Sequence, residues 1–196
     1  MRRLCAILAG GEGRRMGGAK PLRAWGADTL IGHALRFART QAPQVAVALR
    51  TAGQAGAFDA PVVLDAGGIE GPLAGLVAAL ARGGELDCDV VVTLPCDMPL
   101  LPEDLADGLC SALESRPEAL VAVARTGGDL HPVCAAWRVT ALDRSPAYLA
   151  SGKRSLQGFA ALCGAVIVDW PDAATPRFAN ANTPQELSRL RALAAF

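Results

Sequence analysis

Residues 4–22 read LCAILAGGEGRRMGGAKPL, a short apolar run followed by a segment with five glycines. The run, Leu4–Leu8, has the length of a buried strand. Glycines after such a strand let main-chain N–H groups approach an anion closely. Two familiar phosphate motifs do not fit. The dinucleotide fingerprint requires a glycine at the position held by Met16, and the P-loop requires a lysine at the position held by Ala19. The stretch predicts a strand and a different kind of phosphate-binding turn, with a solvated surface loop as the alternative.

The turn carries three cations, Arg14, Arg15 and Lys20. Lysine is rare in this chain, because Lys20 and Lys153 are the only lysines among nineteen basic residues. A compact ammonium suits a single phosphate oxygen, whereas a guanidinium binds through a planar fork. We therefore expect Lys20 to contact phosphate.

Apolar runs of strand length recur along the chain and alternate with segments of helical periodicity. The expected strands cover residues 4–8, 45–49, 62–64, 90–94, 120–124, 133–137 and 166–168, and the expected helices residues 30–38, 73–80, 103–113 and 183–193. Short strands that are apolar on both faces indicate a mostly parallel sheet with helices on both sides. We expect a Rossmann-like three-layer α/β fold in one domain, residues 1–196, with a nucleotide-binding half at 1–100 and a substrate-side half at 101–196.

Three local signals refine this expectation. Pro102 suits the first turn of the helix expected at 103–113. Gly127-Gly128 indicates a turn between two strands. The segment Thr183–Glu186, with proline after the threonine, has the pattern of a capping box and predicts a helix start.

Composition limits the classes of partner and of compartment. Nineteen basic and nineteen acidic residues give a net charge of zero, which provides no general attraction to nucleic acid or to an anionic membrane. The apolar runs are far shorter than the roughly 20 residues of a membrane span. The six cysteines show no zinc-ligand spacing, and we expect buried thiols in a reducing compartment. We expect a cytoplasmic protein that binds neither nucleic acid nor membrane.

Two aspartates follow apolar strands of the expected sheet. Asp65 comes directly after residues 62–64, and Asp97 lies between Pro95 and Pro99, after residues 90–94. The carboxyl ends of parallel strands meet at one edge of a sheet, where ligands bind. Carboxylates beside a phosphate turn are the ligands that Mg²⁺ uses together with a nucleotide. We favour a metal ligand at Asp97 over a simple turn or helix cap.

Five segments together resemble the molybdenum cofactor guanylyltransferases. They are LAGGEGRRMGGAKPL at 8–22, GPLAGL at 71–76, PCDMPLLP at 95–102, HPV at 131–133 and NANTPQEL at 180–187. They stand in the order found in that family and span nearly the whole chain. The resemblance implies a Rossmann-like enzyme that transfers GMP from GTP to molybdenum-molybdopterin, releases pyrophosphate and requires Mg²⁺. A molybdenum insertase or a molybdoenzyme chaperone would be a candidate partner for the product.

The resemblance also implies roles for individual residues. The strand-end backbone that meets the nucleotide matches Leu8, Ala9, Gly10 and Gly11, and main-chain N–H groups of residues 9–13 would stabilise the departing pyrophosphate. Lys20 matches the lysine on the phosphates, Asp65 a nucleotide contact, and Asp97 the magnesium ligand. The pterin side matches Asn180 and Asn182, and the molybdopterin phosphate could meet Lys153 and Arg154.

Two departures from the family pattern leave the nucleobase open. An asparagine expected after the second strand is absent from residues 47–50, VALR, and the loop before Lys20 is one residue shorter. A cytidylyltransferase for the same cofactor, or another NTP-dependent nucleotidyltransferase, is therefore an alternative. A GTP- or pterin-binding carrier without turnover is the non-enzymatic alternative. His131 either lines the pterin pocket or bonds the backbone in a turn.

Overall fold

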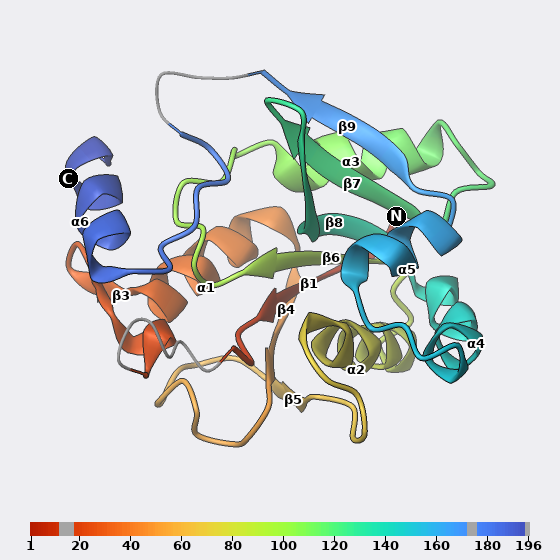
Figure 1. Ribbon diagram of the computed structural model, residues 1–196, viewed down its shortest axis with the longest axis horizontal. Coiled ribbons are helices and arrows are strands. Elements are labelled where there is room, and N and C mark those ends of the chain that lie inside the picture. Colours follow the sequence, from red (N-terminus) through yellow and green to blue (C-terminus); the bar gives the residue numbers. More distant parts are fainter. Residues whose placement is uncertain (12–17, 172–175, 195–196) are drawn as a thin grey trace.

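The computed structural model describes residues 1–11, 18–171 and 176–194. Its centre is a seven-stranded sheet in the order β5-β4-β1-β6-β8-β7-β9 (Figure 1). The strands are β1 (Arg3–Leu8), β4 (Gln44–Leu49), β5 (Val62–Leu64), β6 (Val90–Pro95), β7 (Val121–Thr126), β8 (Asp129–Arg138) and β9 (Val166–Trp170). β8 runs antiparallel to β6 and β7, and the other neighbours pair in parallel. The other strands therefore end at the edge of the sheet where β8 begins.

Helices cover both faces of this sheet, as expected for a Rossmann-like three-layer α/β fold. One face packs against α1 (Leu30–Gln41) and α3 (Leu105–Glu114). The other face packs against α2 (Pro72–Glu85), η3 (Val139–Arg144), α4 (Ser145–Ala150) and α5 (Leu156–Leu162). α6 (Pro184–Leu193) follows the last strand and lies beside the segment that leads into α1 (Figure 1).

The alternation of side chains along β1 shows why the sheet is buried on both faces. Leu4 and Ala6 belong to the apolar cluster under α2, whereas Cys5 and Ile7 belong to the cluster under α1 and α3. All four side chains are fully buried. Successive residues of a strand point to opposite faces, so an unbroken apolar run fits a central strand and would not fit a half-exposed one.

A smaller apolar cluster joins the two ends of the chain. It contains Trp25 from the hairpin β2 (Ala24–Trp25) and β3 (Asp28–Thr29), Leu30 from α1, and Leu187 and Leu190 from α6. The Arg191 guanidinium also donates to the Ala24 carbonyl. The short helix η2 (Lys20–Leu22), which precedes the hairpin, is therefore held near the segment before α6.

Most of the expected elements are confirmed. Every predicted strand and helix has its counterpart, and the turn between β7 and β8 places Gly127 and Gly128 at φ values of 58° and 88°. At the start of α6, the Thr183 side chain accepts from the Glu186 N–H, and the Glu186 side chain accepts from the Thr183 N–H. This arrangement is the predicted capping box. No helix in the described ranges has the length and apolar character needed to cross a bilayer.

The expected start of the third helix is wrong. α3 begins at Leu105, and residues 103–104 lie in the preceding turn. The cause is the buried side-chain amide of Gln41, whose Oε1 accepts from the Ala106 N–H and whose Nε2 donates to the Glu103 carbonyl, both at 2.9 Å. This amide satisfies main-chain groups at the helix start, a pairing that depends on α1 and could not be read from the sequence around residue 103.

Candidate active site

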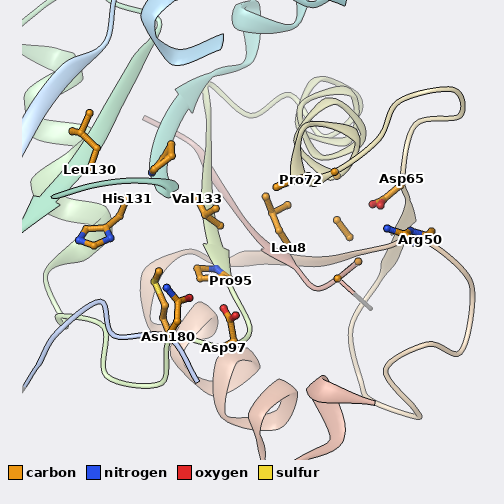
Figure 2. Close-up of a pocket in the computed structure, with 17 residues that line it drawn as sticks. Leu8, Arg50, Asp65, Pro72, Pro95, Asp97, Leu130, His131, Val133 and Asn180 are labelled. Atoms are coloured by element: carbon orange, nitrogen blue, oxygen red, sulfur yellow. The ribbon is translucent and has the colours of Figure 1, made fainter. Parts of the chain in front are cut away.

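A cavity of about 400 Å³ opens at the edge where the parallel strands end (Figure 2). Its walls come from the residues that follow β1, β4, β5 and β6, from the start of α2 and from the start of β8. The residues that line it include Gly10, Gly11, Asp65, Asp97, His131 and Asn180. One cavity therefore joins the end of the first strand, both predicted aspartates and the segment before α6.

Lys20 and Asp97 form an ion pair at this cavity. The Lys20 Nζ contacts the Asp97 carboxylate and also donates to the Asn182 Oδ1 at 2.7 Å. The two charged side chains are only 11% and 17% exposed, so water screens their interaction poorly. Three residues predicted from separate segments thus meet at one point.

The segment before α6 is fixed against the turn that carries Asp97. The Ala181 N–H donates to the Asp97 carbonyl at 2.8 Å, and the Ala181 side chain is fully buried. The Asn182 N–H donates to the Glu186 carboxylate at 2.8 Å, so the capping box of α6 also holds the backbone of Asn182. The amide of Asn182 reaches Lys20 from a backbone that is bonded on both sides.

Asp65 lies at one end of the cavity (Figure 2). A Cβ on Gly10 would lie 2.7 Å from the Asp65 Oδ2, and a Cβ on Gly75 would lie 3.2 Å from its Oδ1. The Asp65 carboxylate would have to shift to admit a Cβ on Gly10 and to move by a few tenths of an ångström to admit one on Gly75. The Asp65 Oδ1 is buried and has no hydrogen-bond partner among the described residues. Burial raises the pKa of the Asp65 carboxyl, and the nearby Arg50 opposes this shift.

Gln54 links two walls of the same end and was missed by the sequence analysis. Its Oε1 accepts from the Arg50 N–H at 3.1 Å, and its Nε2 donates to the Gly11 carbonyl at 3.3 Å. A side-chain amide can bridge in this way because it holds both a donor and an acceptor. Leu49, in the stretch where the family asparagine was sought, is buried in the core. The Gln54 amide lies in the turn beyond β4, near this end of the cavity.

His131 lies at the other end of the cavity, at the start of β8. Its ring stacks on Phe178 with a centroid distance of 4.7 Å and an interplanar angle of 7°. The Nε2 of His131 is buried and without a partner in the described part of the chain. Burial lowers the pKa of His131, and Asp129 opposes this shift, so the imidazole is neutral near pH 7. The residue lies in a strand, so the alternative of a turn histidine is wrong.

Comparison with known proteins assigns this architecture to a family. Residues 5–165 match the model of the MobA-like NTP transferase domain. The chain is 37% identical to a molybdenum cofactor guanylyltransferase of Cereibacter sphaeroides, over 98% of this chain and 97% of that protein. The chain belongs to the molybdenum cofactor guanylyltransferase family. It is therefore a nucleotidyltransferase, as the sequence motifs indicated.

Solved structures support the same fold. The molybdopterin-guanine dinucleotide biosynthesis protein A of Archaeoglobus fulgidus superposes with a TM-score of 0.77 at 23% identity, over 97% of each chain. A Mycobacterium tuberculosis protein, solved in complex with manganese, superposes with a TM-score of 0.68 at 18% identity, over 98% of this chain and 99% of that one. At these identities the two likenesses establish the architecture alone.

Not all of the residues matched to the guanylyltransferase family gather at the cavity. Lys153 and Arg154 are exposed in the loop between α4 and α5 and are absent from the lining of this cavity. The Arg154 guanidinium donates to the carbonyls of Leu149 and Lys153 at 2.8 and 2.7 Å, so it stabilises its own loop. Leu8 and Asn180 do line the cavity.

The main-chain donors expected for pyrophosphate need one correction. The N–H of Ala9 donates to the Ala48 carbonyl at 2.9 Å and continues the pairing of β1 with β4, so it is not free to bind an anion. Gly10 and Gly11 remain as lining residues. Arg14, Arg15 and the rest of the shortened loop at 12–17 lie outside the described residues.

The cysteine beside Asp97 is not a nucleophile. Cys96 is 7% exposed, and burial together with the charge of Asp97 raises the pKa of its thiol to about 12. A thiol that stays protonated near neutral pH is a poor nucleophile and a poor metal ligand. The other cysteines, like Cys96, are buried and free, as the sequence predicted.

The donor set fits a metal ion that arrives with its substrate. Among the described residues, no group of three or more His, Cys, Asp or Glu side chains is arranged to hold a metal. Asp97 offers one carboxylate at the cavity. Mg²⁺ is commonly bound by one or two carboxylates together with substrate phosphates and water. The site therefore suits a nucleotide-borne Mg²⁺ on Asp97 better than a permanently held ion.

Proposed function

We propose that this enzyme transfers GMP from GTP to the terminal phosphate of molybdenum-molybdopterin and releases pyrophosphate. The observation that carries the proposal is the meeting of Lys20 and Asn182 at Asp97, a carboxylate that lines a cavity with two dissimilar ends. A transferase that joins two substrates needs one binding region for each, with the reacting phosphorus between them. Membership of the guanylyltransferase family supports the choice of substrates.

The nucleotide would occupy the end built from Gly10, Gly11 and Asp65. The glycines let the triphosphate approach the backbone closely, and the Asp65 carboxylate lines the cavity, where it can accept a hydrogen bond from the nucleoside. The acceptor would then enter from the end formed by β8. Asn180 and Asn182, on the segment before α6, would lie on the acceptor side of the reacting phosphorus.

The reaction would be an in-line displacement at the α-phosphorus of GTP. An oxygen of the acceptor phosphate forms the new P–O bond while the bond to the pyrophosphate oxygen breaks. The attacking phosphate is already an anion, so the enzyme needs no general base, and its contribution is positioning and charge neutralisation. The Lys20 ammonium would neutralise charge on the phosphates. Asp97 would hold Mg²⁺, which supplies further neutralisation at the α-phosphate when bound.

A divalent ion is also supported by one of the fold neighbours. The Mycobacterium tuberculosis protein with this architecture was solved in complex with manganese. Two-substrate phosphoryl chemistry commonly depends on such an ion, because it neutralises the negative charge that develops on the phosphate oxygens. We infer that Mg²⁺ fills this role here, with Asp97 as its ligand from this chain.

The decisive test is pyrophosphate release with each of the four nucleoside triphosphates, with molybdenum-molybdopterin as acceptor. We expect release with GTP and Mg²⁺ only, and formation of a guanine dinucleotide. Release with CTP instead would establish the cytidylyl alternative. Nucleotide binding without release, for every triphosphate, would establish a carrier and end the proposal.

A variant of Asp97 tests the assignment of roles within the site. Asp97→Asn should lower kcat by at least about 100-fold, because an amide is a poor ligand for Mg²⁺, while much of the GTP affinity remains. The neutral amide can still contact Lys20, so we expect the fold to persist, which thermal unfolding would verify. A kcat near that of the natural enzyme would contradict the role given to Asp97.

A further inference from the structure

An aromatic stack leads from the core of the protein to the β8 end of the cavity. Trp170, in β9, packs against Phe178 with a centroid distance of 5.7 Å, and Phe178 stacks on His131. The Trp170 Nε1 donates to the Asp104 carboxylate at 3.0 Å, which fixes the inner end of the stack. Trp170 and Phe178 are both buried, so the stack is anchored at every ring except the last.

Phe178 holds a backbone conformation that it would not adopt without a constraint. Its φ is 63°, in the left-handed region that bulky side chains avoid. Such a conformation is unfavourable and persists only where the surroundings impose it. Here it places the phenyl ring between Trp170 and His131. The unusual backbone conformation of Phe178 therefore positions the ring on which the imidazole stacks.

The imidazole offers the cavity a neutral ring. Its Nε2 is buried and has no hydrogen-bond partner in the described part of the chain, and burial keeps the ring neutral. One face is covered by Phe178. His131 lines the cavity together with the apolar residues Val133 and Leu130, of which Leu130 lies on the other side of β8 from the ring (Figure 2). A surface of this kind suits a planar heterocycle better than a phosphate.

We propose that His131 is the stacking platform for the heterocycle of the acceptor substrate, supported from behind by Phe178. This inference rests on the proposed function, which places the acceptor at the β8 end and makes it a pterin phosphate. A heterocycle stacks on an aromatic side chain through the faces of the two rings, and this contact needs no hydrogen bond. The platform would align the pterin so that its phosphate extends towards Asp97.

Two variants of His131 separate stacking from polar recognition. His131→Phe keeps a flat aromatic face, and His131→Leu keeps apolar bulk over Phe178 but removes the flat face. For His131→Leu we expect about a tenfold increase in the KM for molybdenum-molybdopterin and in the Kd for a fluorescent pterin, 6-hydroxymethylpterin. For His131→Phe we expect both constants within about twofold of the natural protein. The KM for GTP should not change in either variant.

A neighbouring charge provides the matched control. Asp129→Asn alters the electrostatics around His131 from an exposed position in the same strand and leaves the stack in place. We expect it to change neither pterin affinity nor KM. Thermal unfolding of each variant verifies that the fold is kept. Equal losses in His131→Phe and His131→Leu would show that a polar group acts and would overturn the platform, as would unchanged constants in His131→Leu.

The same measurements separate this inference from the proposed function. If the natural protein binds the pterin probe and His131→Leu weakens it, but no GMP is transferred, the platform stands and the reaction is wrong. If GMP is transferred and His131→Leu retains the natural KM for the acceptor, the platform alone is wrong.

Discussion

The Lys20 ammonium is paired with the Asp97 carboxylate, the group that we expect to bind Mg²⁺. With side-chain exposures of 11% and 17%, neither charge could be left alone without a large desolvation penalty. Lysine therefore serves as the counter-ion while no metal or nucleotide is bound. A metal ion and a triphosphate would replace one pairing by two, with Mg²⁺ on Asp97 and the phosphates on Lys20.

This pairing predicts that metal and nucleotide bind cooperatively. Without nucleotide, Mn²⁺ or Mg²⁺ must compete with Lys20, so we expect weak binding in calorimetry, and at least about tenfold tighter binding with a non-hydrolysable GTP analogue. Lys20→Met should strengthen metal binding in the absence of nucleotide and weaken GTP binding. Lys153→Met removes the other lysine of the chain, at an exposed position outside the cavity, and should leave the metal and GTP affinities unchanged. Equal metal affinity with and without the analogue would refute the competition.

The two glycines after β1 should differ in their tolerance of a methyl group. Gly10→Ala brings a Cβ to 2.7 Å from the Asp65 carboxylate, whereas a Cβ on Gly11 meets no atom within 4 Å. We expect Gly10→Ala to lower the free energy of unfolding by about 1–3 kcal/mol and Gly11→Ala to change it by less than about 0.5. Thermal unfolding of the ligand-free variants measures both. A larger loss in Gly11→Ala would contradict the placement of Asp65.

The Asp65 carboxylate should lower the free energy of unfolding while it strengthens the binding of GTP. Burial raises the pKa of its carboxyl in the folded state above the ordinary value of 3.8, so the folded protein binds a proton more readily than the unfolded chain. The free energy of unfolding therefore falls as pH rises from that value through the raised pKa. Asp65→Asn removes this effect, so its Tm should exceed that of the natural protein at pH 7.

The advantage of Asp65→Asn in Tm should shrink as pH falls through the raised pKa towards 3.8, because the carboxyl is then protonated in the folded state and increasingly also in the unfolded chain. The same variant should bind GTP about tenfold more weakly, because a charged hydrogen-bond acceptor is lost. Unfolding curves between pH 4 and 7, with a GTP titration at pH 7, measure both effects. A lower Tm at pH 7 would show that the carboxylate has a stabilising partner in solution.

The capping box of α6 should matter to the site as well as to the fold. Thr183→Ala removes a helix cap and should lower the free energy of unfolding by about 1 kcal/mol. Ser155→Ala removes the comparable cap of α5, where the Ser155 Oγ accepts from the Gly158 N–H at 3.0 Å. Both variants should lose similar stability, but only Thr183→Ala should weaken GTP binding, because it loosens Asn182. Equal GTP affinities in the two variants would contradict the prediction that the cap at Thr183 supports GTP binding through Asn182 and Lys20.

The strands and the site residues that follow them could be predicted from the sequence for one physical reason. The ends of parallel strands share an edge, so Gly10, Asp65 and Asp97 could be assigned to one region without knowledge of any contact between them. The same reasoning does not extend to a segment that arrives through a loop. Asn182 reaches Lys20 because α6 packs on Trp25, which is a tertiary contact with no signal in the local sequence.

Side chains that act across elements were the ones that sequence reasoning missed. Gln54 bridges Gly11 and Arg50 only because two tight turns fold residues 51–56 back toward β1, and a glutamine in a glycine-rich stretch carries no pattern of its own. The stack of His131 on Phe178 joins residues from β8 and from the segment after β9. Lys153 and Arg154 were matched to the family as a basic stretch, and the structure places both in the loop between α4 and α5, outside the lining of the cavity.

The reversed direction of β8 has a consequence for how the enzyme can change. Ligand-binding edges of parallel sheets are usually formed by loops, which vary easily in length and conformation. Here the wall at the far end of the cavity is the first part of a strand whose later residues pair with β6 and β7. The register of β8 against β7 shifts between His131 and Ala135, so residues 132–134 can absorb a change of length, whereas a change beyond Ala135 would shift the pairing with both β6 and β7.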